Sequence, residues 1–379
     1  MRFSALYLPP LPLMSDALST AVSPTQLPVA PDAPMPHRKV IRSWLIPLSQ
    51  RVTLYPVLLL IFDYVLLFAA LAGTVYFAHW AAKLGCGIAA GLVIGRIFII
   101  GHDACHQSLT PHRTLNKWLG RIAFLCSLTP YSLWDVGHNV VHHGYTNLKG
   151  FDFVWAPFTK DEFNKLPTSP RLLDRIYRSG WAPGLYYMLE VWWRRMFFPN
   201  RSNMPTRRTV FLLDNLLVTA YAVVWIAALG YAASVTDQSV LLVILMGFVL
   251  PFLCWCALIG FVVYVHHTHT SVSWHAERSA WSKAQPFVST TVHLTFALRI
   301  GAALHHIMEH TAHHVDMSVP LYRLKAAQKK LEEMLPGRII IQKFSWHWYF
   351  ETARKCKLYD FSAQCWTDYK GRPTSVAAA

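Results

Sequence analysis

Histidine is the residue type that is best suited to chemistry in this chain, and it is unevenly placed. Nineteen histidines occur in 379 residues, and three short stretches hold eight of them. The eight are His102 and His106 in HDACH, His138, His142 and His143 in HNVVHH, and His310, His313 and His314 in HTAHH. On a helix, residues three or four positions apart share a face, so each stretch can aim two imidazoles at one point. We call these stretches the first, second and third histidine boxes.

The number of histidines predicts two metal ions, because eight imidazoles are too many for one tetrahedral zinc ion with its four ligands. In the second and third boxes, the adjacent histidines His143 and His314 are rotated by at least a quarter turn from their neighbours, which suits a second ion beside the first. Imidazole binds zinc, copper, iron and nickel. An all-nitrogen site favours redox iron that activates O₂, and the chain has no HExxH motif of a zinc hydrolase. A zinc-dependent membrane hydrolase nevertheless stays an alternative.

Further histidines and several acids lie near the boxes in the sequence. We predict His267 and His269, in YVHHTHT, as additional metal ligands. The roles of His266, His305 and His306 stay open between supplementary ligands and polar packing. The acids that could accept hydrogen bonds from ligand N–H groups are Asp103, Asp152, Glu309 and Asp316.

The composition indicates which kind of protein carries these boxes. The chain is 54% hydrophobic and only 15% charged, whereas soluble domains are usually about 25% charged. The seven cysteines form no CxxC motif, so neither a disulfide framework nor a zinc ribbon is indicated. An integral membrane protein is therefore the leading class.

Four apolar runs are long enough to cross a bilayer core of about 30 Å. They cover about residues 55–77, 82–101, 210–233 and 240–265. We expect an all-α membrane protein with two helical hairpins and a helical cytoplasmic cap that carries the boxes. In this division, residues 1–44 are a disordered Pro-rich tail, 45–360 the membrane domain and 361–379 a C-terminal tail.

The positions of the charges explain the formal net charge of +15. The link between the first two runs holds one basic residue, Lys83, and the link between the last two holds none. By the positive-inside rule, both termini and all three boxes lie on the cytoplasmic side, and nucleic-acid binding is disfavoured. Asp63, Arg96 and Asp214 lie within or beside apolar runs, where a charge is costly, so we expect partners for them inside the protein. The aromatic segment 184–198 is predicted to be an interfacial helix or a buried helix of the cap.

The order GHDACH, HNVVHH, HTAHH resembles the membrane-bound fatty acid desaturase superfamily, over about residues 50–350. YVHHTHT and TNLKGFDFVWAP are similar to elements of its acyl-lipid branch, which includes omega-6 and omega-3 (Δ12/Δ15-type) enzymes. The first box reads HDACH where plant members usually have HECGH, and the third reads HTAHH rather than HVAHH. Such changes are typical of bacterial members, so the resemblance implies the inner membrane of a bacterium.

The resemblance implies a di-iron centre held by the eight box histidines, which would be the catalytic residues, and insertion of a cis double bond into the acyl chain of a membrane lipid. O₂ is the implied oxidant, and electrons come from an external ferredoxin or cytochrome-b-type protein with its reductase. Basic loops around 171–178 and 325–330 could dock that donor or face anionic lipid. A related oxygenase (hydroxylase, ketolase, epoxygenase or acetylenase) is the nearest alternative function. A transporter or metal-storage protein is disfavoured, because only four spans are predicted and the histidines lie outside them.

Overall fold

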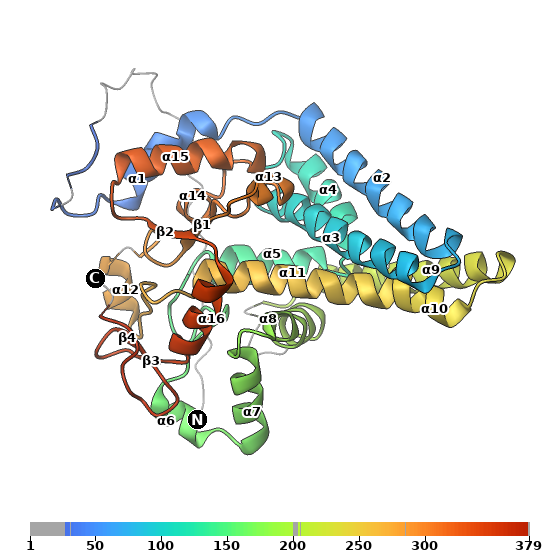
Figure 1. Ribbon diagram of the computed structural model, residues 1–379. Coiled ribbons are helices and arrows are strands. Elements are labelled where there is room, and N and C mark those ends of the chain that lie inside the picture. The colour runs from blue at the N-terminus through green and yellow to red at the C-terminus, as the bar shows by residue number, and fades with distance from the viewer. Residues whose placement is uncertain (1–26, 31, 200–203, 205, 285, 378–379) are drawn as a thin grey trace.

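The computed structural model describes residues 27–30, 32–199, 204, 206–284 and 286–377 of the chain. Long helices extend to one side, and a cap of short helices and loops covers their opposite end (Figure 1). Among the described residues, four helices are long and apolar enough to cross a membrane. The predicted all-α membrane architecture with four spans is thereby confirmed.

The four spans form two hairpins, α2 with α3 and α9 with the last span. Their bounds are Leu54–Tyr76 (α2), Trp80–Cys105 (α3), Thr209–Val235 (α9) and, for the last span, Val240–Ile244 (α10), Leu245–Val249 (η4) and Leu250–His267 (α11). The π-helical turn η4 precedes Pro251, which lacks the N–H that would continue an α-helical hydrogen-bond ladder. Both α3 and α11 run farther than the apolar runs predicted, because their polar last turns are buried under the cap.

Small residues allow α3 to lie against the last span. Gly87, Gly91 and Gly95 are four positions apart and therefore share one face. A Cβ atom on Gly87 would lie 2.4 Å from the Met246 carbonyl oxygen, and one on Gly91 would lie 2.8 Å from the Pro251 carbonyl oxygen. This close approach between helices fits the small-residue packing of membrane helices, and it places the end of α3 beside α11.

The charged residues of the spans have partners, as expected. Asp63 is fully buried and accepts hydrogen bonds from the Arg96 guanidinium, with a shortest N–O distance of 2.8 Å. Asp214 pairs with Arg121 at 2.9 Å and also accepts the backbone N–H of Ser132. Pairing of this kind lowers the cost of placing a charge among apolar helices.

The cap is built from two stretches of chain and the segment before α2. The first stretch, between α3 and α9, contains Arg113–Leu125 (α4), Tyr131–Asp135 (α5), Val136–His142 (η2), Lys160–Lys165 (α6), Thr168–Tyr177 (α7), Pro183–Tyr186 (α8) and Tyr187–Phe197 (η3). The second, after α11, contains Arg278–Ala284 (α12), Val292–Thr295 (β1), Ile300–Ala303 (α13), His310–Val315 (α14), Leu321–Arg323 (η5), Leu324–Met334 (α15), Ile340–Lys343 (β2), Trp346–Lys355 (α16), Leu358–Asp360 (β3) and Cys365–Thr367 (β4). Before α2 lie Arg38–Leu45 (α1) and Ile46–Leu48 (η1).

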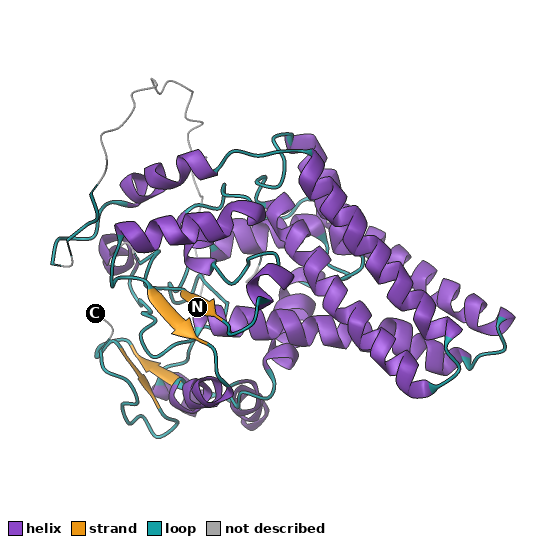
Figure 2. Ribbon diagram, turned by 45° about the horizontal axis from the view of Figure 1, so that its top comes forward, coloured by secondary structure: helices purple, strands orange, loops and turns teal. Residues whose placement is uncertain are grey.

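The strands make two small sheets within the cap, away from the far ends of the spans (Figure 2). β1 pairs in parallel with β2, with Val292 opposite Ile340, and β3 pairs antiparallel with β4. The β1 strand also contacts α11 and α14, so this sheet lies directly beside the third histidine box.

Two segments that were expected to be tails contain packed structure. Residues 1–26 and 31 of the predicted N-terminal tail lie outside the described residues, but 38–45 form α1, which buries Ile41 and Leu45. Near the C-terminus, β4 buries Trp366 completely. Both segments therefore bury apolar side chains, although their local composition does not predict this burial.

Aromatic segment 184–198 forms α8 and η3, and it has two faces. Tyr187 and Trp192 are buried, whereas Trp193 and Phe198 are about half exposed. The segment therefore combines the two predicted possibilities, because one face packs in the protein while rings of the other remain accessible.

Candidate metal centre

The first box lies where α3 ends. His102 is in the last turn of the helix and His106 is its C-cap residue. Their Nε2 atoms are 3.3 Å apart, as the spacing of four predicts for two side chains on one helical face. A membrane span thus aims two imidazoles into the cap.

The second box is wound differently from the expectation. η2 is a π-helix in which the His143 N–H donates to the His138 carbonyl, five residues earlier, at 2.9 Å. Because of this winding, His138 and His143 are the pair that meets, with their Nε2 atoms 3.0 Å apart. An α-helical turn would have paired His138 with His142, which instead faces a different set of histidines.

The third box lies on α14, a six-residue helix held from the next helix of the cap. Gln328 of α15 is buried, and its side-chain oxygen accepts the Ala312 N–H at 2.9 Å. In this position the His313 Nε2 lies 3.1 Å from the His143 Nε2. Two boxes that are 170 positions apart in sequence therefore meet at one point.

The box histidines and one further histidine form two groups of ring nitrogens. The five-nitrogen group comprises His102, His106, His138, His143 and His313. The four-nitrogen group comprises His142, His267, His310 and His314. Within each group one ring nitrogen per residue lies within 4.8 Å of all the others. Adjacent histidines of the second and third boxes fall into different groups.

These groups fit metal ions. Imidazoles on opposite sides of one ion, with metal–nitrogen bonds of about 2.0–2.1 Å, have their nitrogens about 4 Å apart, close to the spread seen here. Neutral nitrogens that converge in this way in the interior have few other stable uses, because only a shared proton or a cation can satisfy several lone pairs at once. The residues present are therefore suited to hold two ions.

The electrostatic environment keeps six of the box imidazoles neutral. Burial, followed by the charges of neighbouring histidines, holds the pKa values of His106, His138 and His143 well below the usual range. The pKa values of His310, His313 and His314 are lowered well below theirs in the same way. A neutral imidazole presents the lone pair that a metal requires, so these residues need not lose a proton at neutral pH before binding.

Hydrogen bonds fix the ring orientation of three members of the four-nitrogen group. The His142 Nδ1 lies 3.0 Å from the Asp152 carboxylate, which also accepts two backbone N–H groups. The His267 Nδ1 lies 3.3 Å from the Thr290 carbonyl oxygen, and the His314 Nδ1 lies 3.3 Å from the Thr146 hydroxyl. Each bond engages the outer nitrogen and leaves Nε2 to face the group.

The other acids near the boxes make their hydrogen bonds to other partners, although one Asp103 oxygen also lies 3.6 Å from the His102 Nδ1. Asp103 accepts the Leu321 N–H at 2.5 Å, and Asp316 pairs with Arg42 at 3.0 Å. Glu309 lies 3.0 Å from the His306 Nδ1. Of the four acids singled out in the sequence, Asp152 is the one that hydrogen-bonds a group member.

The additional histidines separate into distinct roles. His267, predicted as a ligand, belongs to the four-nitrogen group, whereas His269, predicted alongside it, lies outside both groups, with its Nε2 3.4 Å from the Gln342 side chain. His266 stacks on His310 at 3.9 Å between ring centroids. His305 lies 2.8 Å from the Asp63 carboxylate. Together with the His306–Glu309 contact, these three positions show polar packing rather than convergence with the groups.

An apolar cavity reaches both nitrogen groups from the side of the spans. Its lining comprises Phe98, Ile99, His102, Trp134, His138, His142, Phe153, Val154, Tyr187, Val191, Met196, Ile259, Val262, Val263, His266, His267, Ile307 and His310. Apart from the histidines, these side chains are almost all apolar, so the cavity suits a hydrocarbon.

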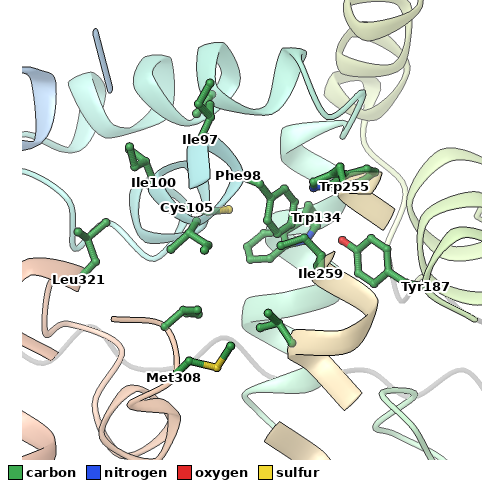
Figure 3. Packing of buried hydrophobic residues seen from close by; sticks show 14 of the residues in the cluster. Ile97, Phe98, Ile100, Cys105, Trp134, Tyr187, Trp255, Ile259, Met308 and Leu321 are labelled. Atoms are coloured by element: carbon green, nitrogen blue, oxygen red, sulfur yellow. The ribbon is translucent and has the colours of Figure 1, made fainter. Parts of the chain in front are cut away.

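Phe98, Trp134 and Tyr187 line this cavity, and Trp255, which is outside the lining, packs with them (Figure 3). Phe98 contacts Trp134 and Trp255 at 5.8 and 5.5 Å between ring centroids, and Tyr187 contacts Trp255 at 5.5 Å. Trp134 also stacks on His138 at 3.9 Å. The aromatic wall made by these rings therefore shapes the cavity and supports a member of the five-nitrogen group.

Sequence reasoning missed Trp134, Thr146 and Gln328 as supports of the histidines. Trp134 could have been found, because it precedes His138 by four positions and so shares a helical face with it. Thr146 and Gln328 act across the fold, and nothing in their local sequence marks them.

The family model and the similar known proteins all indicate the same family. A family model described as fatty acid desaturase matches residues 78–346, which include all three boxes. The sn-1 oleoyl-lipid 12-desaturase of Picosynechococcus sp. is 26% identical over 288 residues, covering 75% of this chain and 78% of that protein. The chloroplastic omega-6 fatty acid desaturase of Glycine max is 26% identical over 274 residues, covering 71% and 61%. The sn-1 acyl-lipid omega-3 desaturase (ferredoxin) of Synechocystis sp. is 27% identical over 248 residues, covering 65% and 66%.

Proposed function

The chain belongs to the fatty acid desaturase family of oxidoreductases, and from this membership we propose that it is a di-iron, O₂-dependent acyl-lipid desaturase that inserts a cis double bond at the Δ12 (omega-6) position. The names of its relatives support the acyl-lipid substrate and the position of the double bond. The changes in its first and third boxes are the reason to propose a bacterial inner membrane as its location.

One observation carries the proposal: two groups of converging imidazole nitrogens lie side by side at the end of an apolar cavity. The proposed ligands, which are also the proposed catalytic residues, are the eight box histidines together with His267. His269 is left out of this set, because it lies outside both groups.

The chemistry explains why a hydrocarbon cavity should end at metal ions. A methylene C–H bond is strong and unpolarised, so acid and base side chains cannot break it. Bound iron supplies, from O₂ and two external electrons, an oxidant that can remove such hydrogens. The overall reaction joins –CH₂–CH₂–, O₂, two electrons and two protons to give –CH=CH– and two molecules of water.

The protein's own residues perform the positioning. The neutral imidazoles would hold the ions, and Asp152, Thr146 and the Thr290 carbonyl would orient three of the rings. The apolar lining would exclude water and hold the acyl chain, so that the carbon lying opposite the nitrogen groups becomes the site of desaturation.

The distribution of charge supports an orientation with the cap and both termini in the cytoplasm. Lys83 is the one lysine or arginine in or beside the two described links at the ends of the spans that are remote from the cap. Its Nζ donates to the Thr74 carbonyl at 2.7 Å. Electrons would come from an external donor, either a ferredoxin or a cytochrome-b-type protein with its reductase. The ferredoxin alternative is supported by a relative whose name includes it.

The decisive experiment is expression in a host that makes monounsaturated but no polyunsaturated lipids, with double bonds located by mass spectrometry. We expect a new Δ12 diene that requires O₂, and purified protein with about two iron ions per chain. Hydroxylated or acetylenic products would show that the protein catalyses a related oxygenation and not the proposed desaturation. Stoichiometric zinc without iron, with activity that survives without O₂, would overturn the oxidoreductase mechanism altogether.

A further inference from the structure

A second cavity, with a lining different from that of the apolar cavity, also reaches the nitrogen groups. Its lining comprises His37, Arg38, His143, Thr146, Trp281, Ser282, Pro286, Phe287 and His314. His143 belongs to the five-nitrogen group and His314 to the four-nitrogen group. Neither residue lines the apolar cavity, which is bordered by other members of both groups. Each cavity therefore reaches both groups, but through different histidines.

This cap-side cleft lies between α1 and α12, at the end of the molecule that is remote from the far ends of the spans (Figure 1). Lipid headgroups surround a membrane protein at the ends of its spans, whereas α12 lies at the outer edge of the cap. The position of the cleft suits a macromolecule that arrives from the aqueous phase.

An aromatic side chain connects the cleft to the histidines. The Trp281 indole N–H donates to the Thr146 carbonyl at 2.9 Å. The Thr146 hydroxyl donates to the His142 carbonyl at 2.8 Å and lies 3.3 Å from the His314 Nδ1. A single residue thus separates the half-buried Trp281 ring from two members of the four-nitrogen group, which makes a short covalent and hydrogen-bonded path for an electron.

The rim of the cleft is basic. Residues 37–39 and 277–283 contain four basic side chains, Arg38, Lys39, Arg278 and Lys283, against one acid, Glu277. Lys39, Arg278 and Lys283 are exposed. The Arg38 guanidinium donates to the His314 carbonyl at 2.8 Å, which brings a positive charge to the backbone of the third box. Charge of this sign attracts acidic proteins and speeds their encounter.

We propose that the cap-side cleft is the docking site of an acidic one-electron donor protein, which passes its electrons through the Trp281–Thr146 contact. The inference rests on the proposed function and names the partner of that same site. Each turnover takes two electrons from two reduced donor molecules, which are oxidised, while O₂ is reduced to two waters with two protons from solvent and two hydrogens from the acyl chain. Substrate and reductant then reach the ions through separate cavities without displacing one another.

The test for docking uses the full chain in nanodiscs of phosphatidylcholine, a net-neutral lipid, and a plant-type [2Fe–2S] ferredoxin as the acidic probe. Binding is measured directly by biolayer interferometry at several salt concentrations. In the double variant Arg278→Glu/Lys283→Glu we expect the Kd to rise at least about tenfold at low salt, with a shallower salt dependence. The variant Arg278→Gln/Lys283→Gln should show a smaller rise in Kd. It replaces the charge-reversal variant in the test if charge reversal harms folding.

Matched charge reversals elsewhere on the cap provide the control. Arg354→Glu on α16, where the side chain is 72% exposed, should leave the Kd unchanged. Lys325→Glu/Lys329→Glu on α15 tests the other basic surface, and a loss of binding there without a loss at α12 would overturn the proposal and move the interface to α15. Equal affinity of the wild type and both α12 variants for ferredoxin would overturn the proposal. The basic side chains of α12 would then be assigned to contacts with lipid headgroups.

The electron path has its own readout. In Trp281→Leu, which removes a ring that lines the cleft, we expect slower oxidation of reduced ferredoxin in stopped-flow measurements made at saturating ferredoxin, where a change in Kd no longer limits the rate. Unchanged ferredoxin oxidation would overturn the path. Failure of the wild type to desaturate lipid even with dithionite would instead refute the proposed function, so the two failures are distinguishable.

Discussion

The two nitrogen groups are held in place by different means. In the four-nitrogen group, the outer nitrogens of three members are hydrogen-bonded to Asp152, to the Thr290 carbonyl and to Thr146. In the five-nitrogen group, the outer nitrogens of four members have no hydrogen-bond partner within the described residues; these members are His102, His106, His143 and His313. Packing holds the rings of this group instead, as in the stacking of Trp134 on His138.

This difference follows from what surrounds each group. The five-nitrogen group lies at the end of α3 against the aromatic wall, where apolar rings can fix an imidazole by shape. The four-nitrogen group lies where segments of the cap supply carboxylate, carbonyl and hydroxyl acceptors. A hydrogen bond to the outer nitrogen also makes the inner nitrogen more basic. The two proposed ions would therefore differ in their ligand strength, although nearly all of their ligands come from the same three boxes.

Removal of one ligand from each group should have the largest effect. In His313→Ala and His310→Ala we expect desaturation to fall at least about 100-fold, because even the partners of metal ligands are worth about 10–100-fold. Each variant should keep about one iron per chain, since it damages one group and spares the other. Iron analysis of the purified variants, with wild-type protein levels as the control, makes the measurement. Loss of both ions in either variant would show that the groups are not independent.

Loss of the carboxylate behind His142 should come next. Asp152→Asn keeps the shape but removes the charge that orients the ring, and we expect a loss of about 10–100-fold in iron affinity or activity. The matched control is Glu309→Gln, because the Glu309–His306 contact has the same 3.0 Å distance but involves a histidine outside both groups. Equal losses in the two variants would argue that a general destabilisation is being measured.

Removal of the stacked ring should affect the five-nitrogen group more mildly. In Trp134→Leu we expect a decrease in activity of up to about tenfold, from a stacking contribution of about 0.5–1.5 kcal/mol. Trp134→Phe retains a ring and should recover most of the activity. The measurement is lipid desaturation per iron-loaded chain. Wild-type activity in Trp134→Leu would contradict the proposed role of packing.

The smallest effect is expected at Thr146. Thr146→Val removes the hydroxyl near His314 but keeps the carbonyl that Trp281 uses, so about 1 kcal/mol, or about fivefold in iron affinity, should be lost. Iron titration of the metal-free protein tests this. A change as large as that of Asp152→Asn would mean that a neutral hydroxyl orients the ring as strongly as a carboxylate does.

Local periodicity predicted much of the fold and part of the site. Apolar runs announced the four spans, and the spacing of four correctly paired His102 with His106. The spacing of HNVVHH fits an α-helix and a π-helix alike, so the pairing of His138 with His143 could not be foreseen. That choice depends on the histidines of the other boxes, which are near in space only.

Long-range contacts account for the rest of what the sequence did not reveal. Asp63, Arg96 and His305 each look isolated, and the last is separated from the first by 242 positions. His267 and His269 share one short motif, yet the end of α11 directs only His267 into a group. The burial of Trp366 likewise depends on a pairing with β3 that no local pattern predicts.

The cluster of Asp63, Arg96 and His305 has a consequence for biosynthesis. Asp63 and Arg96 belong to the first hairpin, so they can enter the bilayer already paired and at a reduced cost. His305 is synthesised much later, and its contact with Asp63 joins the loop before the third box to this finished hairpin. The loop before the third box thereby gains an anchor on the first hairpin. A chain that is inserted wrongly would lack this anchor, and it would be less able to assemble the two nitrogen groups.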